Sequence, residues 1–91
     1  MEESELLQFV KTNLRVFGNS FDETEIEPLI LTAKEDIEAS TGKPFDLDNH
    51  MECLAVVTFV KAHFGSSDIQ DRYIQRYQEQ LAKLGIQKMV A

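Results

Sequence analysis

The chain has 91 residues, of which 43% are apolar and 27% charged, and its formal net charge is -7. A chain of this length forms one domain with a single modest core, and its ordinary apolar share permits folding without a metal or a set of disulfides. The negative charge argues against a free-standing nucleic-acid-binding protein, because such proteins bind phosphates through Lys and Arg.

Helical periodicity runs through nearly the whole chain, so we predict an all-α fold, a compact bundle of four helices in one domain spanning residues 1–91. The first helix is predicted from about Ser4 to Arg15. Its core face consists of Leu6, Leu7, Val10 and Leu14. The helix ends at "VFGNSF", where Phe17 and Phe21 are expected to anchor the loop to the core.

Two starts are open for the second helix, because Asp22 with Glu25 and Thr24 with Glu27 both have the spacing of a capping box. We prefer Thr24, since Pro28 then lies in the first turn, where proline is tolerated. The predicted core stripe contains Ile26, Leu29, Ile30, Ala33 and Ile37. Leu31 lies off this stripe; we expect a neighbouring segment to cover it, and exposure to a partner is the alternative.

The "TGKP" at residues 41–44 suggests either a phosphate-binding loop or the end of a helix. A phosphate loop needs a further Gly before the Lys and a Ser or Thr after it, whereas Pro44 follows Lys43 and removes an N–H. Gly42 is suited to the left-handed residue that ends a helix, and Pro44 prevents the helix from continuing. We therefore interpret this segment as a helix end.

The third helix is predicted from Asn49, with Glu52 at capping-box spacing, to Gly65. Apolar residues surround almost its whole circumference, which predicts the central, buried helix of the bundle. They are Leu54, Val56, Val57, Phe59, Val60 and Phe64.

A fourth helix is expected from Ser67 or Asp68 to Leu84, with Gly85 as its end. Its apolar face holds Ile69, Tyr73, Ile74, Tyr77, Leu81 and Leu84. Arg72, Arg76, Glu79 and Lys83 lie opposite. The segment 86–91 beyond Gly85 carries Ile86, Met89 and Val90 and little charge. It is interpreted either as a flexible docking tail or as an end in which Ile86 folds back on the last turn and the other two are frayed.

Neither a metal site nor a catalytic site is predicted. His50 and Cys53 are close in "DLDNHMEC", but His63 lies ten residues beyond Cys53, so three ligands do not converge. The apolar neighbours of Cys53 favour a buried thiol in a reducing compartment. The acidic clusters have the pattern of a solvated helix face, and no Ser or Cys stands in a readable triad with His63.

The start "MEESELL" lacks the basic residues of a secretion signal, and no apolar run reaches membrane length. We therefore expect a protein made in the cytosol without membrane attachment or cofactors.

The motif order resembles that of the small helical head-tail connector, or head-completion, proteins of tailed double-stranded DNA bacteriophages. A "K..L" element in the first helix matches Lys11 and Leu14. An "IE..TG.P" element follows, and then an apolar helix that ends in His and an aromatic residue. The matching residues there are Ile37, Glu38, Thr41, Gly42, Pro44, His63 and Phe64. The similarity covers residues 6–65, with Pro28 and Gly65 as departures from the family pattern.

The resemblance implies a non-enzymatic adaptor of the virion, assembled in the bacterial cytoplasm as a homo-oligomeric ring beneath the portal protein. A stopper or tail-completion protein would bind the ring, and DNA would pass through its channel. The charge division is compatible with contacts between unlike surfaces of neighbouring subunits, since residues 1–52 hold 13 acidic and 4 basic residues and residues 53–91 hold 3 and 5. The candidate interface residues are Leu31, Arg72, Arg76, Ile86, Met89 and Val90.

The alternative hypothesis is a small cytosolic helical regulator or interaction module that binds a partner helix in a groove. A ring protein associates with itself or with a portal, whereas a regulator of this kind forms a one-to-one complex. An enzyme is a distant third possibility.

Overall fold

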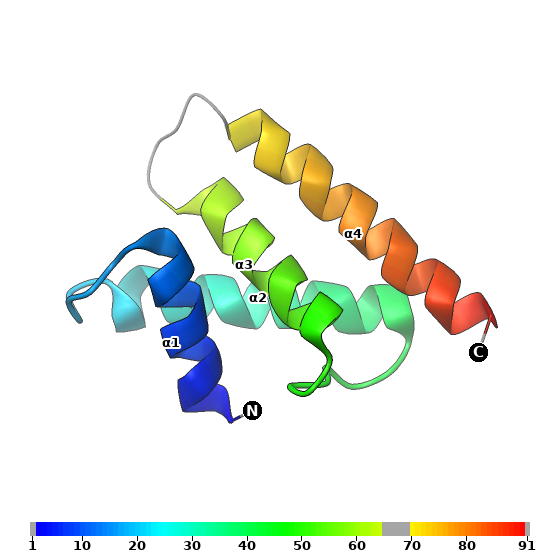
Figure 1. Ribbon diagram of the computed structural model, residues 1–91, viewed down its shortest axis with the longest axis horizontal. Coiled ribbons are helices and arrows are strands. Elements are labelled where there is room, and N and C mark those ends of the chain that lie inside the picture. Colours follow the sequence, from blue (N-terminus) through cyan, green and yellow to red (C-terminus); the bar gives the residue numbers. More distant parts are fainter. Residues whose placement is uncertain (1, 65–69, 91) are drawn as a thin grey trace.

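The computed structural model describes residues 2–64 and 70–90 and contains four α-helices. They are α1 (Glu3–Leu14), α2 (Glu27–Thr41), α3 (His50–His63) and α4 (Gln70–Val90), and a short π-helical turn, Asp22–Ile26, precedes α2. In Figure 1, α3 lies between α1 and α4, and α2 runs across the back of the bundle. The described residues contain no strand, so the predicted all-α fold is confirmed.

Helix α3 is the centre of the core, as its composition predicted. It packs against α4 along much of its length and also against α2 and α1. Six consecutive residues, Ala55 to Val60, are buried, so the helix is covered on nearly every side. Met51 and Leu54 are the exceptions among its apolar residues, with 39% and 36% of their surface exposed.

Helix α1 is fixed at both ends by local hydrogen bonds. At its start the Glu5 carboxylate accepts a hydrogen bond from the Glu2 N–H, and the two residues form a reciprocal capping box. At its end Arg15 adopts a left-handed conformation with φ 61°, and the Val16 N–H donates to the carbonyl of Lys11 at 3.0 Å. Leu6 and Val10 are fully buried, as predicted, and hold α1 in the core.

The loop after α1 differs from the prediction at Phe17, whose side chain is 84% exposed and does not anchor the loop. Lys11 contributes to the anchoring instead: it is buried, and its ammonium group donates to the Asn19 side-chain oxygen at 3.1 Å. Phe21 is partly exposed, and its ring meets the Phe64 ring edge-on with the centroids 5.7 Å apart. A buried ammonium group needs polar partners. The loop supplies one to Lys11 through Asn19, so Lys11 rather than Phe17 connects the loop to α1.

The predicted Thr24 cap is wrong. The chain enters α2 through the π-helical turn, in which the Ile26 N–H donates to the carbonyl of Phe21, and Ile26 occupies the cap position. Pro28 still lies in the first turn of α2, as predicted. Proline is tolerated there because the N–H groups of the first turn have no partner within the helix. The wider turn keeps Ile26 fully buried. Ile30, Ala33 and Ile37 of the predicted stripe are also buried, and Leu29 is half-buried.

Helix α4 continues through Gly85 to Val90, so the predicted end at Gly85 is wrong. Glycine in a helix costs about 1 kcal/mol relative to alanine, which is small enough for tertiary packing to override. At Gly85 the helix passes close to α2, because a Cβ atom at this position would lie 3.7 Å from the Ser40 carbonyl oxygen. The predicted starts at Ser67 or Asp68, and the predicted core residue Ile69, lie outside the described residues.

A buried tyrosine joins α4 to α2. The Tyr77 hydroxyl donates to the Asp36 carboxylate at 2.8 Å, and its ring packs edge-on against Phe59. Burial, the hydrogen bond to Asp36 and the negative charge of Asp36 raise the pKa of Tyr77 above its usual range.

This pKa shift predicts a loss of stability at alkaline pH. Unfolded chains lose the tyrosine proton near pH 10, whereas the folded protein keeps Tyr77 neutral to a higher pH. The stabilisation is therefore full below about pH 10 and is lost as the pH rises further, by at most about 1.4 kcal/mol per pH unit. We expect the melting temperature of the wild type to fall more steeply above about pH 10 than that of Tyr77→Phe. Tyr73→Phe, on the same helix, should follow the wild type; parallel curves for the wild type and Tyr77→Phe would contradict this account.

Candidate functional site

The predicted interface residues lie on separate surfaces. Arg72 and Arg76 are exposed one turn apart on α4. Leu31 is exposed on α2, with 56% of its surface accessible, so the expectation that a neighbouring segment covers it is wrong. The backbone of residues 86–90 continues α4 rather than forming a tail, and the side chains of Ile86, Met89 and Val90 lie outside the described part of the chain.

Helices α1 and α4 lie on opposite sides of α3 and carry exposed charges of opposite sign. The exposed acids of α1 include Glu3 and Glu5, whereas the exposed face of α4 carries Arg72, Arg76 and Lys83. Helix α3 lies between these two helices (Figure 1), and Glu3 already forms an ion pair with Lys34 of α2.

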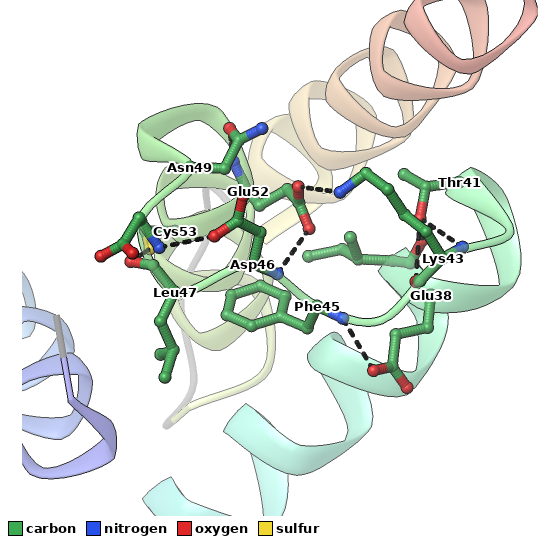
Figure 2. A network of polar contacts seen from close by, with 11 residues as sticks. Glu38, Thr41, Lys43, Phe45, Asp46, Leu47, Asn49, Glu52 and Cys53 are labelled. Atoms are coloured by element: carbon green, nitrogen blue, oxygen red, sulfur yellow. Dashed lines mark hydrogen bonds and ion pairs between the residues drawn. The ribbon is translucent and has the colours of Figure 1, made fainter.

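The "TGKP" segment forms the corner between α2 and α3. Gly42 has a left-handed conformation with φ 74°, and its N–H donates to the carbonyl of Glu38 at 2.8 Å, which confirms the predicted helix end. The Thr41 hydroxyl donates to the Ile37 carbonyl at 3.0 Å. The Glu38 carboxylate then accepts the N–H of Phe45 at 2.8 Å, so α2 also holds the residue after the proline (Figure 2).

A buried carboxylate at the start of α3 closes the same corner. Glu52 is fully buried, and its two oxygens accept hydrogen bonds from the Lys43 ammonium group at 2.7 Å and from the Asp46 N–H at 3.2 Å. Figure 2 shows Lys43 reaching over the loop toward Glu52. A buried carboxylate is stable only with such partners. Lys43 is therefore more than part of a helix end, because it neutralises the charge of Glu52.

The start of α3 keeps half of the predicted capping box. The Asn49 side chain accepts the N–H of Glu52 at 3.2 Å, as expected. The Glu52 side chain does not complete the box, because it faces Lys43 and Asp46 instead. The Asn49–Glu52 spacing correctly predicted the cap. The ion-pair partner of the Glu52 carboxylate is Lys43, nine residues earlier in the chain, and helical spacing does not reveal such a pair.

The candidate metal ligands and catalytic residues, Cys53, His50 and His63, do not form one site. Cys53 is buried, its thiol donates to the Leu47 carbonyl at 3.4 Å, and burial together with the neighbouring Glu52 charge raises the thiol pKa. His50 is exposed at the start of α3, and His63 at its end stacks on Phe59 with the ring centroids 4.3 Å apart. Within residues 2–64 and 70–90, no group of three or more His, Cys, Asp or Glu side chains is arranged to hold a metal ion.

Two surface hollows accompany these features. One, of about 460 Å³, lies between α1 and α2 and includes Leu31. The other, of about 250 Å³, lies between the start of α2 and the end of α3, beside Pro28, Leu29 and Phe64. Of the helices that the structure describes, none combines the length and apolar character needed to cross a lipid bilayer.

Comparison with protein-family models, with curated proteins and with solved structures finds no match for this chain.

Proposed function

We propose that the protein is a non-enzymatic head-tail connector of a tailed bacteriophage, which assembles as a homo-oligomeric ring at the portal vertex of the virion. In this role it joins the DNA-filled head to the tail through the portal protein and a stopper or tail-completion protein. DNA passes through the ring without sequence-specific binding. The protein acts through shape and contact, without a cofactor.

The observation that supports this proposal is the α2–α3 corner, because it contains most of the residues that carry the resemblance. Thr41 and Gly42 form the helix end, and Glu38 fixes the loop. The corner sets the direction of α3 relative to α2, and α3 carries α1 and α4 on its two sides. The motif therefore determines how the outer surfaces of the bundle are oriented.

The charge distribution supports assembly from identical subunits. A ring requires that one surface of a subunit binds a different surface of its neighbour. The acidic surface of α1 and the arginine face of α4 are different surfaces on opposite sides of α3, and their charges are complementary.

Reversing two arginines tests this function. We expect Arg72→Glu/Arg76→Glu to lower the fraction of assembled protein at least tenfold, or to abolish binding to the portal protein, while the monomer stays folded. One exposed ion pair contributes at most about 1 kcal/mol, but a ring repeats the contact in every subunit. Native mass spectrometry of the full chain, alone and with the portal protein, measures the assembly.

The matched control is Arg72→Lys/Arg76→Lys, which keeps the charge and should assemble like the wild type. Assembly of the charge-reversed variant at the wild-type level would exclude pairing through these arginines. A wild-type chain that neither oligomerises nor binds a portal, and instead forms a one-to-one complex, would contradict the connector function and favour an interaction module.

A further inference from the structure

The groove between α1 and α2 has the lining of a protein-binding site. It encloses about 460 Å³. Its walls are Glu3, Ser4 and Leu7 of α1 and Glu27, Ile30, Leu31 and Lys34 of α2. The four residues of α2 follow helical spacing, so the groove extends for about 10 Å along this helix.

The middle of the groove is apolar. Ile30 is nearly buried, Leu7 is half-buried, and Leu31 is 56% exposed. An exposed leucine beside a hollow contributes favourable free energy when another apolar side chain covers it. Leu31 therefore provides a place where a partner residue of similar size gains free energy by binding.

The charge that remains unpaired in the groove lining is acidic. Lys34 is the one basic residue of the lining, and it already pairs with the Glu3 carboxylate and lies over the ring of Phe45. Glu27 is exposed and has no ion-pair partner among the described residues. Glu2 and Glu5 add exposed negative charge at the same end of α1 as Glu3. A partner that fits this charge carries Lys or Arg.

This chain does not itself present such a surface on a described helix. The exposed large apolar side chains of its helices are Leu31, Met51 and Leu54 on α2 and α3, whereas the exposed basic residues of its helices lie on α4. Among the side chains that the structure describes, no helix of a second copy therefore offers an exposed apolar anchor beside Lys or Arg, which favours a segment of another protein as the ligand.

We infer that the α1–α2 groove binds an amphipathic basic helix of another protein, with one leucine-sized side chain against Leu31 and a basic residue facing Glu27. Helices bind in grooves through anchors at such spacing, and a length of about 10 Å accommodates two helical turns. The groove shares Glu3 with the acidic surface of α1 that is proposed to meet the arginine face of a neighbouring subunit, but its apolar centre and Glu27 lie on α2, and the inference does not depend on the connector function.

The probe is a fluorescein-labelled synthetic 14-residue peptide of Leu and Lys at helical spacing, and fluorescence anisotropy with the full chain measures its affinity. We expect Leu31→Gln to weaken binding at least tenfold and Glu27→Lys to weaken it at least fivefold. The same peptide with Glu in place of Lys should bind at least tenfold more weakly than the basic peptide. Amide chemical-shift changes on addition of the basic peptide should concentrate in residues 3–7 and 27–34.

Leu54→Gln is the matched control, because Leu54 is also an exposed leucine but lies on α3, outside the groove. Its affinity for the peptide should equal that of the wild type, and all three variants should keep the wild-type melting temperature within a few degrees. Absence of binding, equal effects of Leu31→Gln and Leu54→Gln, or shift changes centred elsewhere would overturn the inference. So would a wild-type dimer that Leu31→Gln dissociates, because a second copy would then occupy the groove.

Discussion

Val57→Asp is expected to unfold the protein or to lower its melting temperature by roughly 20 °C or more. Val57 is buried in the middle of α3, with 4% of its surface exposed, among the apolar residues of the core. An unpaired carboxylate in such a position costs about 4 kcal/mol or more, a large part of the stability of a domain of this size. Circular dichroism at 222 nm during heating measures the effect.

Leu54→Asp is the control for this experiment. It introduces the same charge on the same helix three residues earlier, at a position that is 36% exposed. Water can solvate a carboxylate there, so we expect a change in the free energy of unfolding of at most about 1 kcal/mol. A wild-type melting curve for Val57→Asp, or equal losses in the two variants, would show that α3 is not the central helix.

The second large effect is expected at the α2–α3 corner, where Lys43→Met should lower the free energy of unfolding by about 2 to 3 kcal/mol. The substitution leaves the fully buried Glu52 carboxylate with the Asp46 N–H as its hydrogen-bond donor in the part of the chain that the structure describes. Breaking a fully buried ion pair costs about 3 to 5 kcal/mol. The Lys43 side chain is half exposed, so solvent screening lowers the expected loss to the bottom of this range or below it. Urea denaturation of both proteins gives the difference directly.

Two comparisons separate the buried pair from the general loss of a lysine. Lys34→Met removes the partner of Glu3, whose side chain is 64% exposed, and should cost no more than about 1 kcal/mol. Adding Glu52→Gln to Lys43→Met removes the uncompensated charge, so the double variant should be more stable than Lys43→Met alone. If Lys43→Met and Lys34→Met lose the same free energy, the charge of Glu52 is not held by Lys43.

The same corner links the stability of the fold to the proposed function. Lys43 and Glu52 fix the loop between α2 and α3, and α3 carries the helices with the acidic and basic surfaces. If Lys43→Met leaves the protein folded, its α2–α3 angle is less constrained. The binding surfaces that we propose on α1 and α4 would then lose part of their fixed relative orientation.

Much of the helical architecture follows from the sequence, because its signals are local. The apolar residues around α3 are incompatible with an exposed helix, and they therefore predict the central position that the structure shows. Gly42 favours the left-handed conformation that ends a helix, and Pro44 prevents the helix from continuing, so this end was predicted from local sequence. The buried stripe of α2 follows from the spacing of its apolar residues.

Tertiary structure decided the features that depend on segments distant in the chain. Gly85 is an adequate helix end by local preference, yet α4 passes close to Ser40 of α2 at this residue and continues to Val90, and the local cost of glycine is small. The pairing of Lys43 with Glu52 requires the path of the whole loop between them. The exposure of Leu31 depends on α1, which packs on α3 and leaves a groove beside α2. Periodicity specifies which face of a helix is apolar, but which segments cover that face is determined by the packing of all four helices together.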